Sequence, residues 1–68
     1  MESNNMVHRA NQIALNFASY PHEDAVARTT NHLKMFWEPR MKKQLHDYVA
    51  KGGGGLHELV LEAEKRLK

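Results

Sequence analysis

The chain has 68 residues, which is enough for one domain but near the lower limit for folding alone, because a chain of this size buries only about 60% of its unfolded surface. It contains no cysteine, which excludes disulfides and thiolate metal sites, and no run close to the roughly 18 apolar residues of a membrane span. The net charge is +2, and the positive excess lies in the segment from Lys34 to Lys51, which has five basic residues against two acidic ones.

These features limit the class of protein. A basic segment this short is typical of a solvated helix face, or of a surface that touches nucleic acid or an acidic protein. The first residues do not have the basic and then apolar pattern of a secretory leader, so we expect a soluble, cytoplasmic protein with one domain over residues 1–68. Without disulfides or a thiolate metal site, the stability of the domain must come from good helix packing or from a partner.

A first helix is predicted over about residues 3–19. Apolar residues recur there at steps of three and four, the period of one helix face. They are Met6, Val7, Ala10, Ile13, Ala14 and Phe17. Asn11, Gln12 and Asn16 lie beside this stripe, where their amides can bond either the backbone of a neighbouring chain or water.

A second helix is predicted from Pro21 to about residue 36 or 37. Proline favours the first turn of a helix, and Glu23 and Asp24 would lie near the positive end of the helix dipole. Its apolar side is predicted to comprise Ala25, Val26, Thr29, Leu33 and Phe36. Pro39 then ends or kinks this helix, because proline lacks a backbone donor and disfavours helical geometry in the preceding residue.

Two further amphipathic segments follow. The third helix has its apolar residues at Met41, Leu45, Tyr48 and Val49, and the fourth has them at Leu56, Leu59, Val60, Ala63 and Leu67. Between them, the glycine run Gly52–Gly55 predicts a helix C-cap followed by a flexible joint. The fourth helix can dock on the other three or on a partner. The predicted fold class is therefore all-α, a small bundle of three to four short helices.

No group of residues in the sequence carries catalytic chemistry. The five histidines are scattered, with no pair at the i, i+4 spacing of a zinc helix, and the glycine run lacks the strand and the Lys-Ser or Lys-Thr of a phosphate loop. We expect no catalytic, cofactor or metal site. The short helices and the basic third helix fit the outline of a helix-turn-helix DNA binder, although Trp37-Glu38-Pro39 makes an awkward turn and Asp47 lies on the third helix.

Several motifs give the chain a family resemblance. They are Ala10-Asn11-Gln12-Ile13-Ala14, Phe17, Pro21, His32-Leu33, Phe36-Trp37-Glu38-Pro39-Arg40-Met41, and Gly55-Leu56 with Leu59-Val60. With these motifs in this order, the chain resembles, over nearly its whole length, the delta subunit of the cytoplasmic NAD-dependent formate dehydrogenases. The four-glycine run is longer than the resemblance predicts.

The resemblance implies a small helical accessory subunit of a hetero-oligomeric enzyme that interconverts formate plus NAD with carbon dioxide plus NADH. Its larger subunits would carry a molybdenum or tungsten pterin, iron-sulfur clusters and FMN, and the cysteines that such clusters require are absent from this chain. We therefore expect a non-catalytic subunit that binds the catalytic subunit and neither oxidises formate nor binds NAD by itself. Two alternatives stay open, namely an assembly factor absent from the mature enzyme and a small nucleic-acid-binding domain.

The partner-binding site is predicted at the aromatic corner before the third helix, since Trp and Arg are enriched among the energetic anchors of interfaces. The predicted residues are Phe36, Trp37, Arg40, Met41, Asn11, Gln12 and Phe17. Under this interpretation, Trp37→Ala and Arg40→Ala weaken association and leave the helix content largely intact. In the alternative, Phe36 and Trp37 fill the domain's own core and Arg40 bonds a carbonyl at the end of the second helix.

Overall fold

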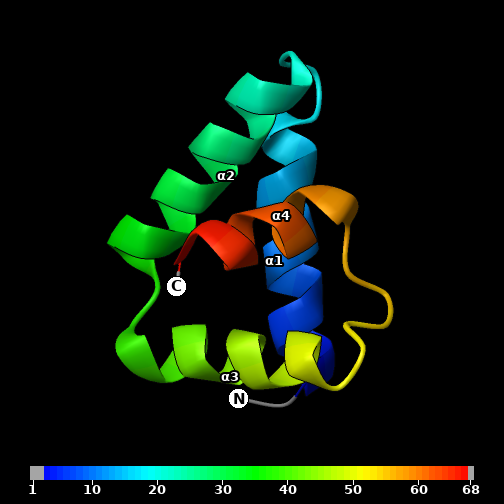
Figure 1. Ribbon diagram of the computed structural model, residues 1–68, viewed down its shortest axis with the longest axis vertical. Helices are drawn as coiled ribbons and strands as arrows, with labels where there is room; N and C mark the ends of the chain where they lie inside the picture. The colour runs from blue at the N-terminus through cyan, green and yellow to red at the C-terminus, as the bar shows by residue number, and fades with distance from the viewer. Residues whose placement is uncertain (1–2, 68) are drawn as a thin grey trace.

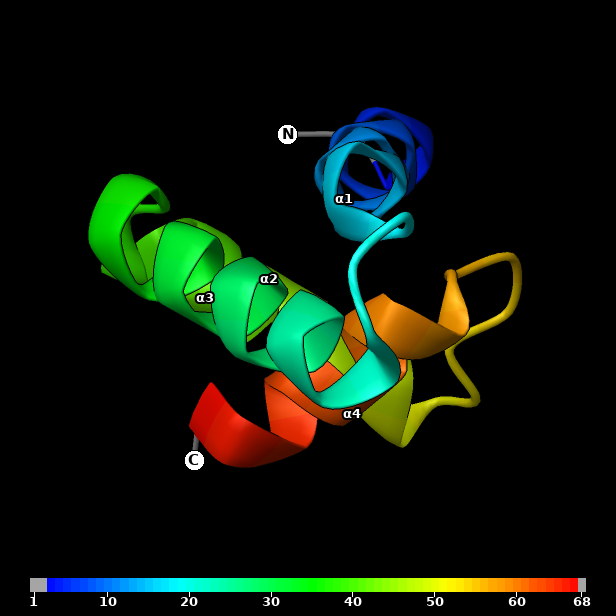
Figure 2. The ribbon, with the colours of Figure 1, turned by 90° about the horizontal axis from the view of Figure 1, so that it is seen from above.

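The computed structural model describes the backbone of residues 3–67 and the side chains of residues 5–67. It contains four helices, α1 (Ser3–Phe17), α2 (His22–Phe36), α3 (Pro39–Ala50) and α4 (Glu58–Leu67), and no strand within residues 3–67. The predicted all-α class is confirmed. Helices α1 and α2 form a V, α3 crosses the open end of the V, and α4 lies across one face of this triangle (Figure 1). Seen from above, α1 and α4 lie on opposite sides of α2 (Figure 2).

The core lies inside the triangle and is built from the predicted apolar stripes. Its fully or nearly fully buried apolar residues are Met6, Ala10, Ile13, Ala14, Ala25, Val26, Leu33, Trp37, Leu45, Leu59, Val60 and Ala63. The many alanines let helices approach closely, and the buried Thr29 hydroxyl donates to the Ala25 carbonyl oxygen at 2.7 Å, so that no polar group is left unpaired there. Helix α4 contacts each of the other three helices. Of the two possibilities left open by the sequence, the fourth helix therefore docks on the rest of its own domain.

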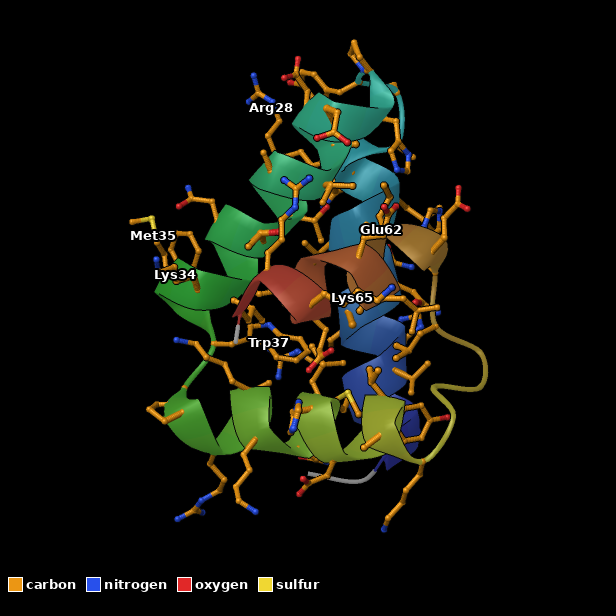
Figure 3. All side chains as sticks on the ribbon, viewed as in Figure 1. Arg28, Lys34, Met35, Trp37, Glu62 and Lys65 are labelled. Carbon is orange, nitrogen blue, oxygen red and sulfur yellow. The ribbon has the colours of Figure 1, made fainter. Side chains whose placement is uncertain are left out.

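The corner between α2 and α3 separates two adjacent aromatic rings. The backbone leaves the helix at Trp37 (φ −90°, ψ 135°), and Pro39 occupies the first turn of α3. As a result Trp37 turns into the core and is 6% exposed, whereas Phe36, still on the helix, is 69% exposed. Figure 3 shows Trp37 in the space between α2, α3 and α4. The prediction that Phe36 belongs to the apolar side of the second helix is wrong, because α2 reaches past the core at this position.

The glycine run forms a defined helix end. Gly52 N–H donates to the Val49 carbonyl (3.0 Å) and Gly53 N–H to the Tyr48 carbonyl (3.1 Å), the two bonds of a Schellman motif. Gly53 is buried with φ +64°, a backbone conformation that favours glycine, and a Cβ there would displace the end of the Leu61 side chain, 2.9 Å away. The predicted C-cap is confirmed.

The remainder of the predicted flexible joint is tied to the bundle by hydrogen bonds. The Tyr48 hydroxyl donates to the Gly54 carbonyl at 2.5 Å. Asn11 in α1 donates from Nδ2 to the Gly55 carbonyl (2.9 Å) and accepts at Oδ1 from the His57 N–H (2.8 Å). The Asn11 amide therefore holds the segment before α4 at two points, Gly55 and His57. The sequence analysis considered bonds to a neighbouring chain or to water and did not predict this role.

The separation of the two rings at the corner generates a prediction about stability. Trp37→Ala removes a buried ring and is expected to cost about 3–5 kcal/mol of unfolding free energy, enough to unfold a domain this small. Phe36→Ala is the matched control, and because this ring is mostly exposed its loss should change stability by no more than about 0.5 kcal/mol. Denaturant unfolding followed by circular dichroism measures both, and equal losses would contradict the burial of Trp37.

The tie at Asn11 generates a second prediction. Asn11→Ala leaves the half-buried His57 N–H without an acceptor, and should cost about 1–3 kcal/mol and speed amide exchange between residues 53 and 60. Asn11→Asp keeps the acceptor and loses the donor, so its effect should be intermediate. Asn16→Ala, at an exposed position on the same helix, is the control. Exchange rates that are the same in the Asn11 and Asn16 variants would show that the tie is not needed.

Candidate functional site

A groove of about 270 Å³ runs between α1 and the C-terminal end of α2. It is lined by His8, Arg9, Gln12, Ile13, His32, Phe36 and Trp37. The i, i+3 and i+4 spacing of α1 brings His8, Arg9 and Gln12 to one wall, and the last turn of α2 supplies the rings of the other. The buried Trp37 contributes to the lining while the rest of its ring belongs to the core.

A row of aromatic rings continues along the same pair of helices. The rings of His32 and Phe36 have centroids 4.7 Å apart, and His32 meets Phe17 edge to face at 6.2 Å. Phe17 in turn lies 6.1 Å from Tyr20, whose ring has the Arg28 guanidinium 4.2 Å above its centre. Contacts of this geometry order side chains that would otherwise be mobile. The result is a partly exposed aromatic surface running from Phe36 to Tyr20.

The groove brings four of the predicted site residues together. Phe36 and Gln12 line it, and Phe17 adjoins it through His32. Trp37 contributes to the lining but is a core residue. This agrees with the alternative interpretation, in which Trp37 fills the domain's own core. The same alternative is wrong for Phe36, which is exposed. That these residues bind a partner stays a prediction.

The other predicted site residues lie elsewhere. Asn11 has both ends of its amide bonded within the chain. Met41 is half-buried against the core. Arg40 is exposed and makes no hydrogen bond or ion pair with the part of the chain that the structure describes. The carbonyl near the end of α2 is bonded by a different cation, since Lys42 Nζ donates to the Lys34 carbonyl oxygen at 2.8 Å.

The sequence analysis did not predict that Glu64 is buried. Glu64 in α4 is 2% exposed, its Oε1 lies 2.5 Å from His46 Nδ1 of α3, and its Oε2 is buried with no partner in the described residues. A spacing signal was present, because Glu64 follows Val60 by four positions and precedes Leu67 by three on the apolar stripe of this helix. The pair joins α3 to α4, and no group of three His, Cys, Asp or Glu residues suited to a metal forms within the described part of the chain.

The acidic residues lie away from the groove. Glu62 contacts His22 at 2.6 Å and Glu23 contacts Arg66 at 2.9 Å, both between α2 and α4, while none of the groove-lining residues is acidic. These exposed pairs contribute little to stability, and they hold Glu62 and Glu23 between α2 and α4. Among the described helices, none combines the length and apolarity that a membrane span requires.

Comparison with known proteins identifies the family. A family model described as the NADH-dependent formate dehydrogenase delta subunit, FdsD, matches residues 5–63. The match begins in α1, includes all of α2 and α3 and reaches most of α4, so it takes in the groove and the glycine run. Searches of curated proteins and of solved structures return no match. With the motifs of both helices of the groove inside the matched region, this chain belongs to the family of NADH-dependent formate dehydrogenase delta subunits.

Proposed function

We propose that the chain is a non-catalytic accessory subunit that binds the catalytic subunit of an NAD-dependent formate dehydrogenase. The observation that carries this proposal is the family match over residues 5–63, which spans nearly the whole described fold. A delta subunit of a multi-subunit enzyme needs a surface for its partners. The groove and the aromatic surface beside it are the part of this molecule best suited to that role.

The chemistry of the chain supports a non-catalytic role. Iron-sulfur clusters are held chiefly by cysteine thiolates, and this sequence has no cysteine. Two of the histidines make structural contacts: His46 Nδ1 contacts Glu64, and His57 Nδ1 accepts the Leu59 N–H at 3.1 Å. We accordingly assign the pterin metal, the iron-sulfur clusters and FMN to the larger subunits of the complex.

Exposed apolar side chains support a binding role. Phe36 is 69% exposed and its neighbour Met35 is 67% exposed, two large apolar groups at the end of one helix. Figure 3 shows Met35 and Lys34 directed away from the bundle. Exposed aromatic residues next to a groove are typical of interface anchors, which are enriched in such side chains and bury them against the partner. We therefore assign to Phe36 the role of principal anchor, which the sequence analysis gave to Trp37 and Arg40.

Affinity purification of the tagged chain, co-expressed with the formate dehydrogenase subunits, tests this function. We expect stoichiometric retention of the catalytic subunit, and an approximately 30-fold or greater loss of affinity in Phe36→Ala, as for an interface hot spot. Leu15→Ala is the matched control, because Leu15 is an exposed apolar residue (56%) of α1 that does not line the groove.

The outcomes distinguish the possible roles. Retention during maturation but not in the finished enzyme would identify an assembly factor. Failure of any formate dehydrogenase subunit to co-purify would overturn the proposal. Equal losses in the Phe36 and Leu15 variants would leave the subunit role intact and move its interface away from the groove.

A further inference from the structure

The groove between α1 and α2 has unused hydrogen-bond donors on its polar wall. The side chains of Arg9 and Gln12 are exposed, and neither side chain makes a hydrogen bond or ion pair within the described part of the chain. Two other arginines of the chain are engaged, Arg66 with Glu23 and Arg28 with the Tyr20 ring. A guanidinium has five donors and pairs best with a carboxylate, often through two parallel bonds.

The surroundings of Arg9 favour an anion. No carboxylate lines the groove, and the described side chains of α1 include no acidic residue. His8 and His32 line the same groove and add ring N–H donors to it. Glu62 and Glu64 of α4 contact His22 and His46, Glu23 of α2 contacts Arg66, and none of these carboxylates lines the groove.

The opposite wall favours an apolar side chain. Phe36 and His32 present rings, Ile13 and Trp37 complete an apolar lining, and the volume is about 270 Å³. Pockets that hold small-molecule ligands usually measure about 300–1,000 Å³ and enclose the ligand. A groove below that range, open along a helix pair, suits one large side chain projecting from another protein.

We infer that the groove receives a segment of the catalytic subunit in which a large apolar side chain is flanked by a carboxylate, with the side chain against Phe36 and the carboxylate on Arg9. This inference rests on the proposed function and adds to it the chemistry of the recognised segment. The segment is anchored by burial of its apolar group, and its position along the groove is set by the charge pair.

Binding of the purified chain to the catalytic subunit, measured in low salt (about 50 mM) and in high salt (about 500 mM), tests the inference. Arg9→Glu should raise Kd about tenfold or more in low salt, and the difference should shrink in high salt, because the lost attraction is electrostatic. Arg9→Gln should give an intermediate loss, and Arg9→Lys should give a smaller loss than Arg9→Gln, because it keeps the charge but not the paired donors of the guanidinium.

Lys65→Glu is the matched control. It makes the same reversal of charge on an exposed residue of α4 that does not line the groove. Circular dichroism melting of each variant verifies the fold. The inference is overturned if Arg9→Glu binds like the unaltered chain, or if Lys65→Glu weakens binding equally. Absence of binding by the unaltered chain would overturn the proposed function as well. Normal binding by the unaltered chain, with no effect of Arg9→Glu, would overturn the inference and leave the proposed function standing.

Discussion

The burial of Trp37 at the corner between α2 and α3 is the contact on which the rest of the structure depends. A domain of this size has room for few large side chains, and Trp37 fills the space between α2, α3 and α4. The backbone departs from helical geometry at this residue, and Pro39 starts the next helix without needing a donor. Because Trp37 turns inward, Phe36 is left on the outside, and the same corner creates both the core and the exposed anchor of the groove.

The second constraint is the attachment of α4. Its apolar face closes the core, the Schellman motif at Gly52 and Gly53 reverses the chain after α3, and the Asn11 amide holds the approach. The buried Glu64 adds a polar contact to His46 of α3. A buried carboxylate with one oxygen unpaired is costly, so this contact contributes more to the specific seating of α4 than to overall stability. Because α4 packs on the other three helices, we place the proposed partner surface on the α1–α2 side.

Much of this fold is predictable from the sequence, because its signals are local. Proline and glycine mark the helix ends, and the spacing of three and four residues identifies nearly every buried position. The assignment of Phe36 and Trp37 is not predictable in this way, since both are large and adjacent and the direction of each depends on where α2 stops. The partner of Asn11 is likewise set by contacts with Gly55 and His57, distant in sequence. For the candidate site, motifs point to Phe36, Gln12 and Phe17, whereas the role of Arg9 emerges only when the two helices are seen together.

The central claim is that Phe36 and the α1–α2 groove face the catalytic subunit while α4 faces away. Photo-crosslinking tests it most directly, with a benzoylphenylalanine placed at position 36 or, for comparison, at position 65 of the assembled complex. Phe36 is exposed and the substitute is also an aromatic ring, so the fold should tolerate it. The account predicts a crosslink to the catalytic subunit from position 36 and none from position 65. A crosslink from position 65 alone would contradict it and place the interface on α4.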